Sequence, residues 1–430
     1  MIYKTAAGHK EQQPAEKETV TMEKKSTLAN IFYNSFGTMF YYGCQWLTTL
    51  LVVRLSGYAD SGVYSLAMTF TAAFAILALF NTRQYQVSDV TGEYSDRTYI
   101  YSRFAAMVIA FSICVAGLCV NRYTPYQWGA ILLYMIYKCE EAWIDVYHGI
   151  DQKNGRMDYI CYSYIARGVL MMGSFCGILY LTKNLVSAIG TMMLTTFLVA
   201  VFYDRRIAEG FISKDSRADK NGIKKLMFAM LPLAVVAMTN NLSISFPKYF
   251  LQMYFGDEAL GYYSSVATPS MIVQVGASTI FVPLITPLAD RLQDNDKKGF
   301  CRILKQVAVV FLVLSVLALL ASAWLGEWFL VLVFKEEIRP YVYLFVPIIV
   351  STLMISVNAC LFPVCTVLRE IKGQLFVGIG GALSSFLASM VCVKKYYMNG
   401  VVIALLITLA VQIIIEVYCV YHKMRKWKEV

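Results

Sequence analysis

The sequence predicts an all-α membrane protein with about twelve transmembrane helices in two six-helix lobes and both termini in the cytoplasm. Apolar residues make up 58% of the 430 positions and charged residues only 15%, whereas about a quarter of the residues of a soluble protein are charged. The apolar residues form runs of roughly 20, the length at which a helix spans the hydrocarbon core. The alternating ten-residue segments of a membrane β-barrel are absent from the sequence, which favours helical spans.

The N-lobe is expected over residues 29–203, after a polar cytoplasmic tail at 1–28. We expect no signal peptide, because the first 25 residues are polar and mixed in charge, and Met22 is a second candidate for the start of translation. Hydropathy and turn signals place the helices of this lobe near 29–53, 61–80, 102–121, 127–148, 163–182 and 185–203.

The C-lobe is expected over residues 226–421, after a basic cytoplasmic linker at 204–225 and before a cytoplasmic tail at 422–430. Residues 324–339 are too few to span the bilayer and predict a short interfacial or re-entrant helix. The spanning helices of this lobe are expected near 226–251, 259–285, 303–323, 340–366, 373–393 and 400–421.

The distribution of Lys and Arg predicts the orientation in the membrane. Of the 38 such residues, 29 lie in segments on the side of the two termini, 7 lie in segments on the other side, and Lys138 and Lys248 fall within spans. Positive residues accumulate on the cytoplasmic side of membrane proteins, so both termini are expected there. The net charge of +10 is therefore explained by orientation, and no nucleic-acid partner is expected.

Cysteine and histidine give no sign of a metal or disulfide framework. The chain has 11 Cys and 3 His, but no Cys-x-x-Cys pair, and no loop on the predicted outer side holds two cysteines. Most of the cysteines lie inside predicted spans, where they act as small packing residues. We expect no metal site and no cofactor.

A nine-residue pattern occurs once in each predicted lobe. The pattern Gly-x4-Gly-x-Tyr-Ser is found at Gly57–Ser65 and again at Gly256–Ser264, 199 residues apart and each time after the first helix of its lobe. Because six helices return the chain to the same side, the two copies are parallel repeats related by an axis along the membrane normal. Two such lobes around a central cavity are typical of transporters that work by alternating access.

The fourth predicted helix carries a stripe of polar side chains. They recur every three or four residues, which places them on one helix face: Tyr134, Lys138, Glu141, Asp145 and His148. Charged residues inside spans are costly and usually face protein or water. The stripe therefore predicts either the lining of a cavity that opens inward or an internal pair of Lys138 with Glu141 or Glu140.

Other basic residues lie near the helix ends. Arg83, Arg103 and Arg167 are expected at the cytoplasmic ends of helices 2, 3 and 5, where they can bind a ligand or anchor the helices. Lys248 follows Pro247 in the outer third of helix 7, where it can face the cavity or reach the external interface. Helices 1 and 7 contain no acidic residue, so the cavity is expected to prefer an anion such as a pyrophosphate.

The ordered combination of short motifs resembles the polysaccharide-biosynthesis flippases, a family with a MATE-like fold in the multidrug/oligosaccharidyl-lipid/polysaccharide exporter superfamily. The resemblance covers residues 28–420. In the first half it is carried by Asn34, by Arg54 with 57–67, by 83–89 with Tyr99 and Arg103, and by Gln152, Arg156, Asp158 and Arg167. In the second half it is carried by 247–250 with Gly256 and Gly261. Lys248 departs from the family, in which arginine more often follows this proline, and it lacks the bidentate geometry of arginine.

The resemblance implies a transporter, not an enzyme, in the bacterial plasma (inner) membrane. It would flip undecaprenyl-diphosphate-linked oligosaccharides to the outer leaflet for capsule, O-antigen (lipopolysaccharide) or a related glycan, while the lipid tail stays among the membrane lipids. The residues expected to hold the diphosphate and head group are Lys138, Arg83, Arg103, Arg167 and Lys248. The residues expected to couple transport to H⁺ or Na⁺ are Glu140, Glu141 and Asp145.

Three other functions are weighed against this one. A MATE-type multidrug antiporter would need acidic cavity walls, which helices 1 and 7 do not supply. The flippase of the peptidoglycan precursor usually has fourteen helices. A membrane-embedded glycan polymerase or ligase needs a sizeable external loop for its catalytic residues, and every predicted external loop here is short except 323–339.

Overall fold

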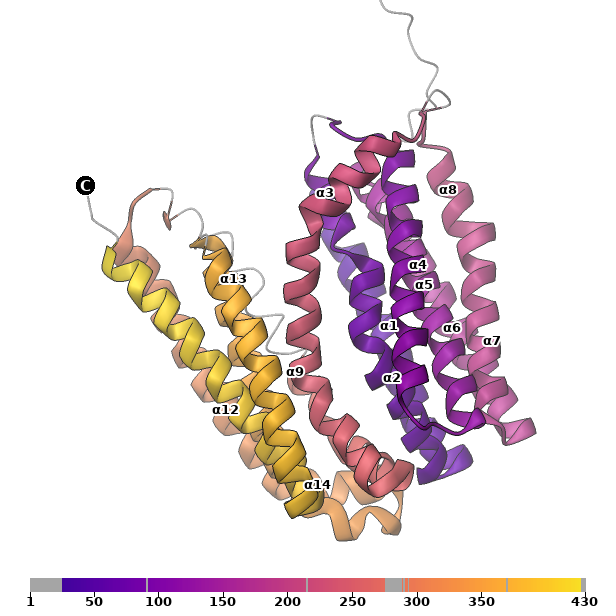
Figure 1. Ribbon diagram of the computed structural model, residues 1–430, viewed down its shortest axis with the longest axis vertical. Helices are drawn as coiled ribbons and strands as arrows, with labels where there is room; N and C mark the ends of the chain where they lie inside the picture. Colours follow the sequence, from indigo (N-terminus) through magenta and orange to yellow (C-terminus); the bar gives the residue numbers. More distant parts are fainter. Residues whose placement is uncertain are drawn as a thin grey trace, which may run out of the picture.

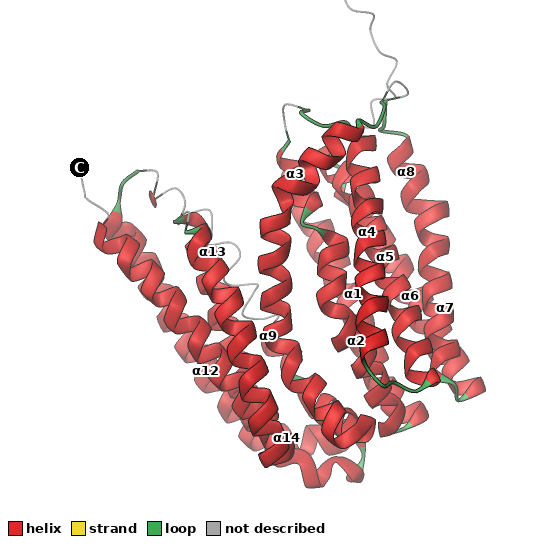
Figure 2. Cartoon of the chain, viewed as in Figure 1, coloured by secondary structure: helices red, strands yellow, loops and turns green. Residues whose placement is uncertain are grey.

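The computed structural model describes residues 25–89, 92–213, 216–274, 288, 291–292, 294–368 and 370–426, and every regular element in them is a helix (Figure 2). This confirms the all-α prediction. Residues 1–24 and 427–430 of the predicted tails, with the alternative start Met22, lie outside the described residues, as do residues 275–285 of the helix expected at 259–285.

The helices of the first lobe follow one another in an up-and-down bundle (Figure 1). Four of them begin after a side chain that accepts a hydrogen bond from a free N–H group of the first turn. At the start of α5, for example, Thr124 and Gln127 form a capping box. The elements are α1 (Thr27–Ser56), α2 (Tyr58–Leu79), α3 (Thr82–Ser88), α4 (Asp96–Val120), α5 (Pro125–Lys153), α6 (Met157–Thr182), α7 (Leu185–Val199), the π-helix η1 (Ala200–Asp204) and α8 (Arg205–Glu209).

The second lobe contains two helical elements that each hold more than one straight helix. α14 changes direction at Tyr397, which has a φ of 54°, and its two halves pack antiparallel, since Gly373 lies against Cys419 and Gly381 against Gln412. α9 breaks at Gly256, with a φ of 83°. The elements are α9 (Lys220–Ala267), α12 (Lys297–Phe334), the 3₁₀ helix η3 (Glu336–Leu344), α13 (Phe345–Val367) and α14 (Ile371–Lys426).

Seven helices of the described chain are long and apolar enough to cross a membrane, or eight when the bent α9 is counted as one span. The predicted number of spans is larger for three reasons. The two halves of α14 form one continuous element, and α1 and α5 are as long as the other helices but carry more polar side chains. The helix expected at 259–285 lies partly outside the described residues. The protein is therefore a multi-pass membrane protein.

Two helix ends differ from the sequence prediction. The helix expected to end at residue 203 continues through η1 and α8 to Glu209, so Asp204 is a buried helix residue. The prediction of a separate short helix at 324–339 is wrong, because α12 is continuous to Phe334 and the chain turns only at Lys335, with a φ of 68°. A glycine inside this helix, Gly326, lets the ring of Phe345 approach, so it serves packing and does not break the helix.

The two copies of the repeated glycine motif pack against each other. A Cβ atom on Gly62 would overlap the backbone of Asp257, and a Cβ atom on Gly261 would overlap the carbonyl oxygen of Tyr58. The contacts are reciprocal, because Tyr58 and Asp257 each follow the first glycine of their motif. Gly57 and Gly256 share the same backbone conformation, with φ values of 91° and 83°. The motif thus forms a seam between the lobes, on the side predicted to be external.

On the opposite side the lobes diverge. Figure 1 shows α12, α13 and α14 leaning away from the first-lobe helices toward the end of the molecule where the C-terminus lies. Aromatic stacking strengthens the seam at the other end, since the ring of Tyr262 lies 4.0 Å from that of Tyr58 and 4.3 Å from that of Tyr341. Among the described residues, the contacts between the two motif copies therefore lie on the side of the membrane predicted to be external.

Candidate functional site

The first lobe encloses a cavity of about 390 Å³ between four of its helices. Helix α5 supplies the predicted polar stripe, and α1, α2 and α6 supply the other walls. The lining side chains are Tyr41, Tyr42, Gln45, Met68, Ala72, Ala75, Leu79, Tyr134, Lys138, Glu141, Asp145, His148, Tyr164 and Arg167. All five residues predicted on the helix-4 stripe are among them.

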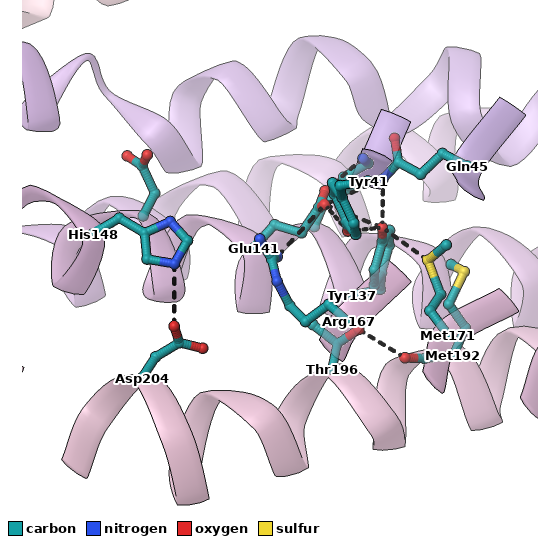
Figure 3. A network of polar contacts seen from close by, with 12 residues as sticks. Tyr41, Gln45, Tyr137, Glu141, His148, Arg167, Met171, Met192, Thr196 and Asp204 are labelled. Atoms are coloured by element: carbon teal, nitrogen blue, oxygen red, sulfur yellow. Dashed lines mark hydrogen bonds and ion pairs between the residues drawn. The ribbon is translucent and has the colours of Figure 1, made fainter. Parts of the chain in front are cut away.

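Glu141 lies at the centre of the polar contacts in this cavity (Figure 3). Its Oε2 atom lies 2.6 Å from Nζ of Lys138, and its Oε1 atom lies 3.9 Å from Nη1 of Arg167. Tyr41 and Tyr137 donate hydroxyl hydrogen bonds to Oε1, the latter at 3.1 Å, and Gln45 donates to it at 3.3 Å. One carboxylate thus fixes groups from α1, α5 and α6.

Aromatic rings hold the two cations on either side of Glu141. The Lys138 ammonium lies 5.4 Å from the ring of Tyr134. The Arg167 guanidinium lies 4.5 Å from the ring of Tyr41 and 5.0 Å from that of Tyr164. Such cation–π contacts stabilise a positive charge without neutralising it. Arg167 is only 3% exposed and its Nε atom has no hydrogen-bond partner among the described residues.

A second ion cluster lies toward the predicted cytoplasmic end of the cavity. Asp145 accepts from Arg83 at 3.2 Å and from Arg103 at 2.8 Å. Arg103 is fully buried, and it also donates to the carbonyl oxygens of Ala78 and Leu79. Those carbonyls belong to the last turn of α2, where carbonyl oxygens have no N–H donor within the helix. Arg103 therefore ties α2, α4 and α5 together and is the most structural of the predicted basic residues.

A π-helical turn brings an acid of the sixth helix to His148. The Nε2 atom of His148 lies 3.1 Å from Oδ1 of Asp204, and each side chain is 1% exposed. Asp204 is the last residue of the π-helix η1, a rare geometry that often marks functional sites. Figure 3 shows this pair beside the Glu141 cluster, on the same side of α5.

The charges of the two clusters do not cancel. Within the part of the chain that the structure describes, the cations Arg83, Arg103, Lys138 and Arg167 pair with the two carboxylates of Glu141 and Asp145. Lys138 and Arg167 line the cavity, whereas Arg83 and Arg103 reach Asp145 from outside its lining. In a membrane protein an excess of positive charge around a cavity favours an anion there. The arrangement can bind a group with several negatively charged oxygens.

The structure therefore brings together most of the residues predicted from the sequence. Lys138 both lines the cavity and pairs with Glu141. Glu140 and Lys248 lie apart from this cavity. Glu140 is buried on α5 with its Oε2 atom unpartnered among the described residues, and Lys248 is on α9 in the second lobe.

Other residues of the site had not been singled out from the sequence. Tyr41 and Tyr137 bind Glu141, Tyr164 holds Arg167, and Asp204 pairs with His148. Tyr137 could have been predicted from the sequence, because a residue four positions before Glu141 lies on the same helix face. The roles of Tyr41 and Asp204 depend on contacts between helices far apart in the sequence.

Comparison with known proteins gives one family and one fold. The model of the family described as "Polysaccharide biosynthesis protein" matches residues 27–293, more than half of the chain. The capsular polysaccharide biosynthesis protein CapF of Staphylococcus aureus is 23% identical over 296 residues, which are 68% of this chain and 74% of that protein.

Solved structures support the fold. The lipid II flippase MurJ, in an inward closed conformation, matches with a TM-score of 0.68 and 11% identity over 92% of this chain and 89% of MurJ. A mutant of the MATE transporter VcmN from Vibrio cholerae matches with a TM-score of 0.62 and 11% identity, covering 93% of this chain and 95% of VcmN. The predicted MATE-like fold is confirmed.

Proposed function

Since this chain belongs to the polysaccharide biosynthesis protein family, as the sequence motifs predicted, we propose that it flips undecaprenyl-diphosphate-linked oligosaccharides across the bacterial plasma membrane. The direction is from the cytoplasmic leaflet to the outer leaflet, where the units enter a surface polysaccharide. The observation that carries this proposal is the cavity of the first lobe, which is lined by Lys138 and Arg167 and flanked by Arg83 and Arg103, the partners of its Asp145.

The cavity chemistry fits a diphosphate with a sugar attached. Lys138 and Arg167 flank Glu141 and offer charged donors to phosphate oxygens, which form strong, short hydrogen bonds with such groups. The rings of Tyr41, Tyr134 and Tyr164 provide apolar faces with polar edges, which suit a sugar ring. The lipid tail stays in the membrane outside the bundle.

The contacts at the seam indicate from which side of the membrane the head group would enter in this conformation. The lobes pack tightly at Gly62 and Gly261, on the side predicted to be external, and diverge on the other. A head group would therefore enter from the cytoplasm, and rocking of the lobes would open the seam and release it outside.

The multidrug antiporter alternative is less consistent with this cavity. Its acids, Glu141 and Asp145, are each paired with two basic groups, so neither presents a free negative charge to a cationic substrate. Their pairing also weakens the prediction that these acids carry the coupling ion.

The test is the substitution Lys138→Ala in a strain that lacks the chromosomal gene. We expect this variant to lose surface glycan at normal membrane abundance, Lys138→Arg to retain part of it, and the exposed control Lys224→Ala to match the unaltered protein. Normal display by Lys138→Ala would mean that the cavity does not line the transport pathway.

A further inference from the structure

The second lobe contains a buried acid that the proposed function does not use. Glu416 lies in the second half of α14, ten residues before its end at Lys426, which corresponds to a rise of about 15 Å along the helix. Its side chain is 0% exposed. A carboxyl group at this depth is costly to insert and is usually functional.

Neither oxygen of Glu416 has a hydrogen-bond partner among the described residues. The acids of the first-lobe cavity differ in this respect, since Glu141 and Asp145 each contact two basic side chains. An unpaired carboxylate in an apolar interior is strongly disfavoured, so such a group holds a proton instead of a charge. We therefore expect the Glu416 carboxyl group to be protonated, and so uncharged, in this conformation.

The titratable groups described around Glu416 supply no counter-ion. The cysteines close enough to interact electrostatically with Glu416 are Cys360 and Cys365 of α13 and Cys419, one turn farther along α14. The next acid, Glu370, precedes α14 and is already paired with Lys423 at 3.1 Å. Thiols of this kind neither neutralise a carboxylate nor compete for its proton at neutral pH.

A chain of amides near Glu416 links its helix to other helices of the lobe. One turn before it, Gln412 accepts a hydrogen bond from Asn358 of α13 at 3.2 Å and donates one to Asn240 of α9 at 3.4 Å. Gly381 leaves room for the Gln412 amide between the two halves of α14. The helix that carries Glu416 is thus linked to α9, the helix that forms the seam with the first lobe.

We propose that Glu416 is the proton-binding site of the second lobe and couples flipping to the proton gradient. An O–H bond forms at one Oε atom when the site faces the proton-rich side, and it breaks when the lobe has turned to the other side. The proton is the only species exchanged. This inference rests on the proposed function.

Infrared spectroscopy of the full-length protein in lipid vesicles tests proton binding without the substrate. The carbonyl stretch of a protonated carboxylic acid is expected in the unaltered protein at neutral pH, shifted in D₂O and lost at high pH. Glu416→Gln should lose one component of this band, which is seen in the difference between its spectrum and that of the unaltered protein, and the control Glu370→Gln should keep it. A spectrum that Glu416→Gln leaves unchanged would overturn the proposal.

Transport in the gene-deleted strain tests coupling. We expect Glu416→Gln to lose surface glycan at normal membrane abundance, Glu416→Asp to retain part of it, and Glu370→Gln to match the unaltered protein. Full display by Glu416→Gln, or display that follows external Na⁺ at fixed pH, would refute proton coupling and leave the flippase function standing. If the unaltered protein itself restores no display, the flippase proposal fails, and the infrared result alone decides the role of Glu416.

Discussion

Glu141 organises the cavity of the first lobe although it opposes the charge of the proposed ligand. It contacts Lys138 and Arg167 and accepts hydrogen bonds from two tyrosines. A carboxylate in this position keeps the cations separated and oriented while the cavity is empty. An entering diphosphate would then replace Glu141 as their partner.

Removal of this carboxylate should therefore favour anion binding at the expense of stability. We expect Glu141→Gln to lower the thermal unfolding midpoint of the purified protein, because buried cations lose a partner. Inorganic pyrophosphate should bind the variant about tenfold more tightly than the unaltered protein, the scale of one charged hydrogen bond. Binding can be followed as a ligand-induced rise in the midpoint.

The control for this experiment is Glu209→Gln, which removes an exposed acid paired with Arg205 outside the cavity. It should change neither quantity. Weaker pyrophosphate binding by Glu141→Gln would show that Glu141 helps to hold the anion and does not compete with it.

His148 is expected to contribute to stability through its hydrogen bond to Asp204 and through a ring contact with Tyr164 at 5.2 Å. In His148→Ala the buried Oδ1 atom of Asp204 loses its hydrogen-bond partner, which costs about 1–3 kcal/mol. Denaturant unfolding in detergent should report this loss, whereas the exposed control His422→Ala should unfold like the unaltered protein. Equal stability of the two variants would mean that the buried pair contributes nothing.

The residues that sequence reasoning identified and those it did not differ in a physical way. Lys138, Glu141, Asp145 and His148 share one face of one helix, and helical periodicity alone groups them. Tyr41 and Asp204 join them from other helices, and no local pattern encodes such contacts. Glu416 could have been found, because it is a single acid within the span predicted at 400–421.

Among the elements, the seam between α2 and α9 is the contact most sensitive to a single atom. Gly62 and Gly261 have no space for a Cβ atom, because the backbone of the other lobe occupies it. The sequence predicted the repeat from this motif but not that the two copies touch. That contact follows from the symmetry axis, which places equivalent positions opposite each other.

A methyl group at the seam should therefore push the lobes apart. We expect Gly62→Ala and Gly261→Ala each to abolish surface glycan and to make the external end of the seam accessible to an aqueous thiol reagent at an introduced Tyr58→Cys. Gly173→Ala, at a helix position with nothing within 4 Å of the added atom, should be silent. Full activity of both seam variants would show that the seam does not have to close.

At the scale of the whole molecule, hydropathy was enough to predict the helical membrane fold, and short motifs were enough to predict the family. Helix ends were harder to predict. The stretch 324–339 was predicted to be a separate helix because it is too short to span the bilayer, yet α12 runs unbroken through it as far as Phe334. Helix continuity depends on packing such as that of Gly326 against Phe345, which composition does not reveal.

The predicted orientation has its own test. A fluorescent protein fused after the last residue should fluoresce, because it folds in the cytoplasm, and alkaline phosphatase at the same position should be inactive. A phosphatase fused after Asn184, on the predicted outer side, should be active. The opposite pattern would reverse the direction assigned to the cavity and the seam.

The measurement that most directly tests the central claim is flipping by the purified protein in vesicles. A short-chain lipid-linked diphosphate oligosaccharide is placed in the inner leaflet, and its arrival in the outer leaflet is followed by oxidation of the sugar with external periodate. Vesicles with the unaltered protein should expose the sugar, whereas those with Lys138→Ala or without protein should not. Equal exposure in all three preparations, or none in any, would contradict a flippase that works through the Lys138 cavity.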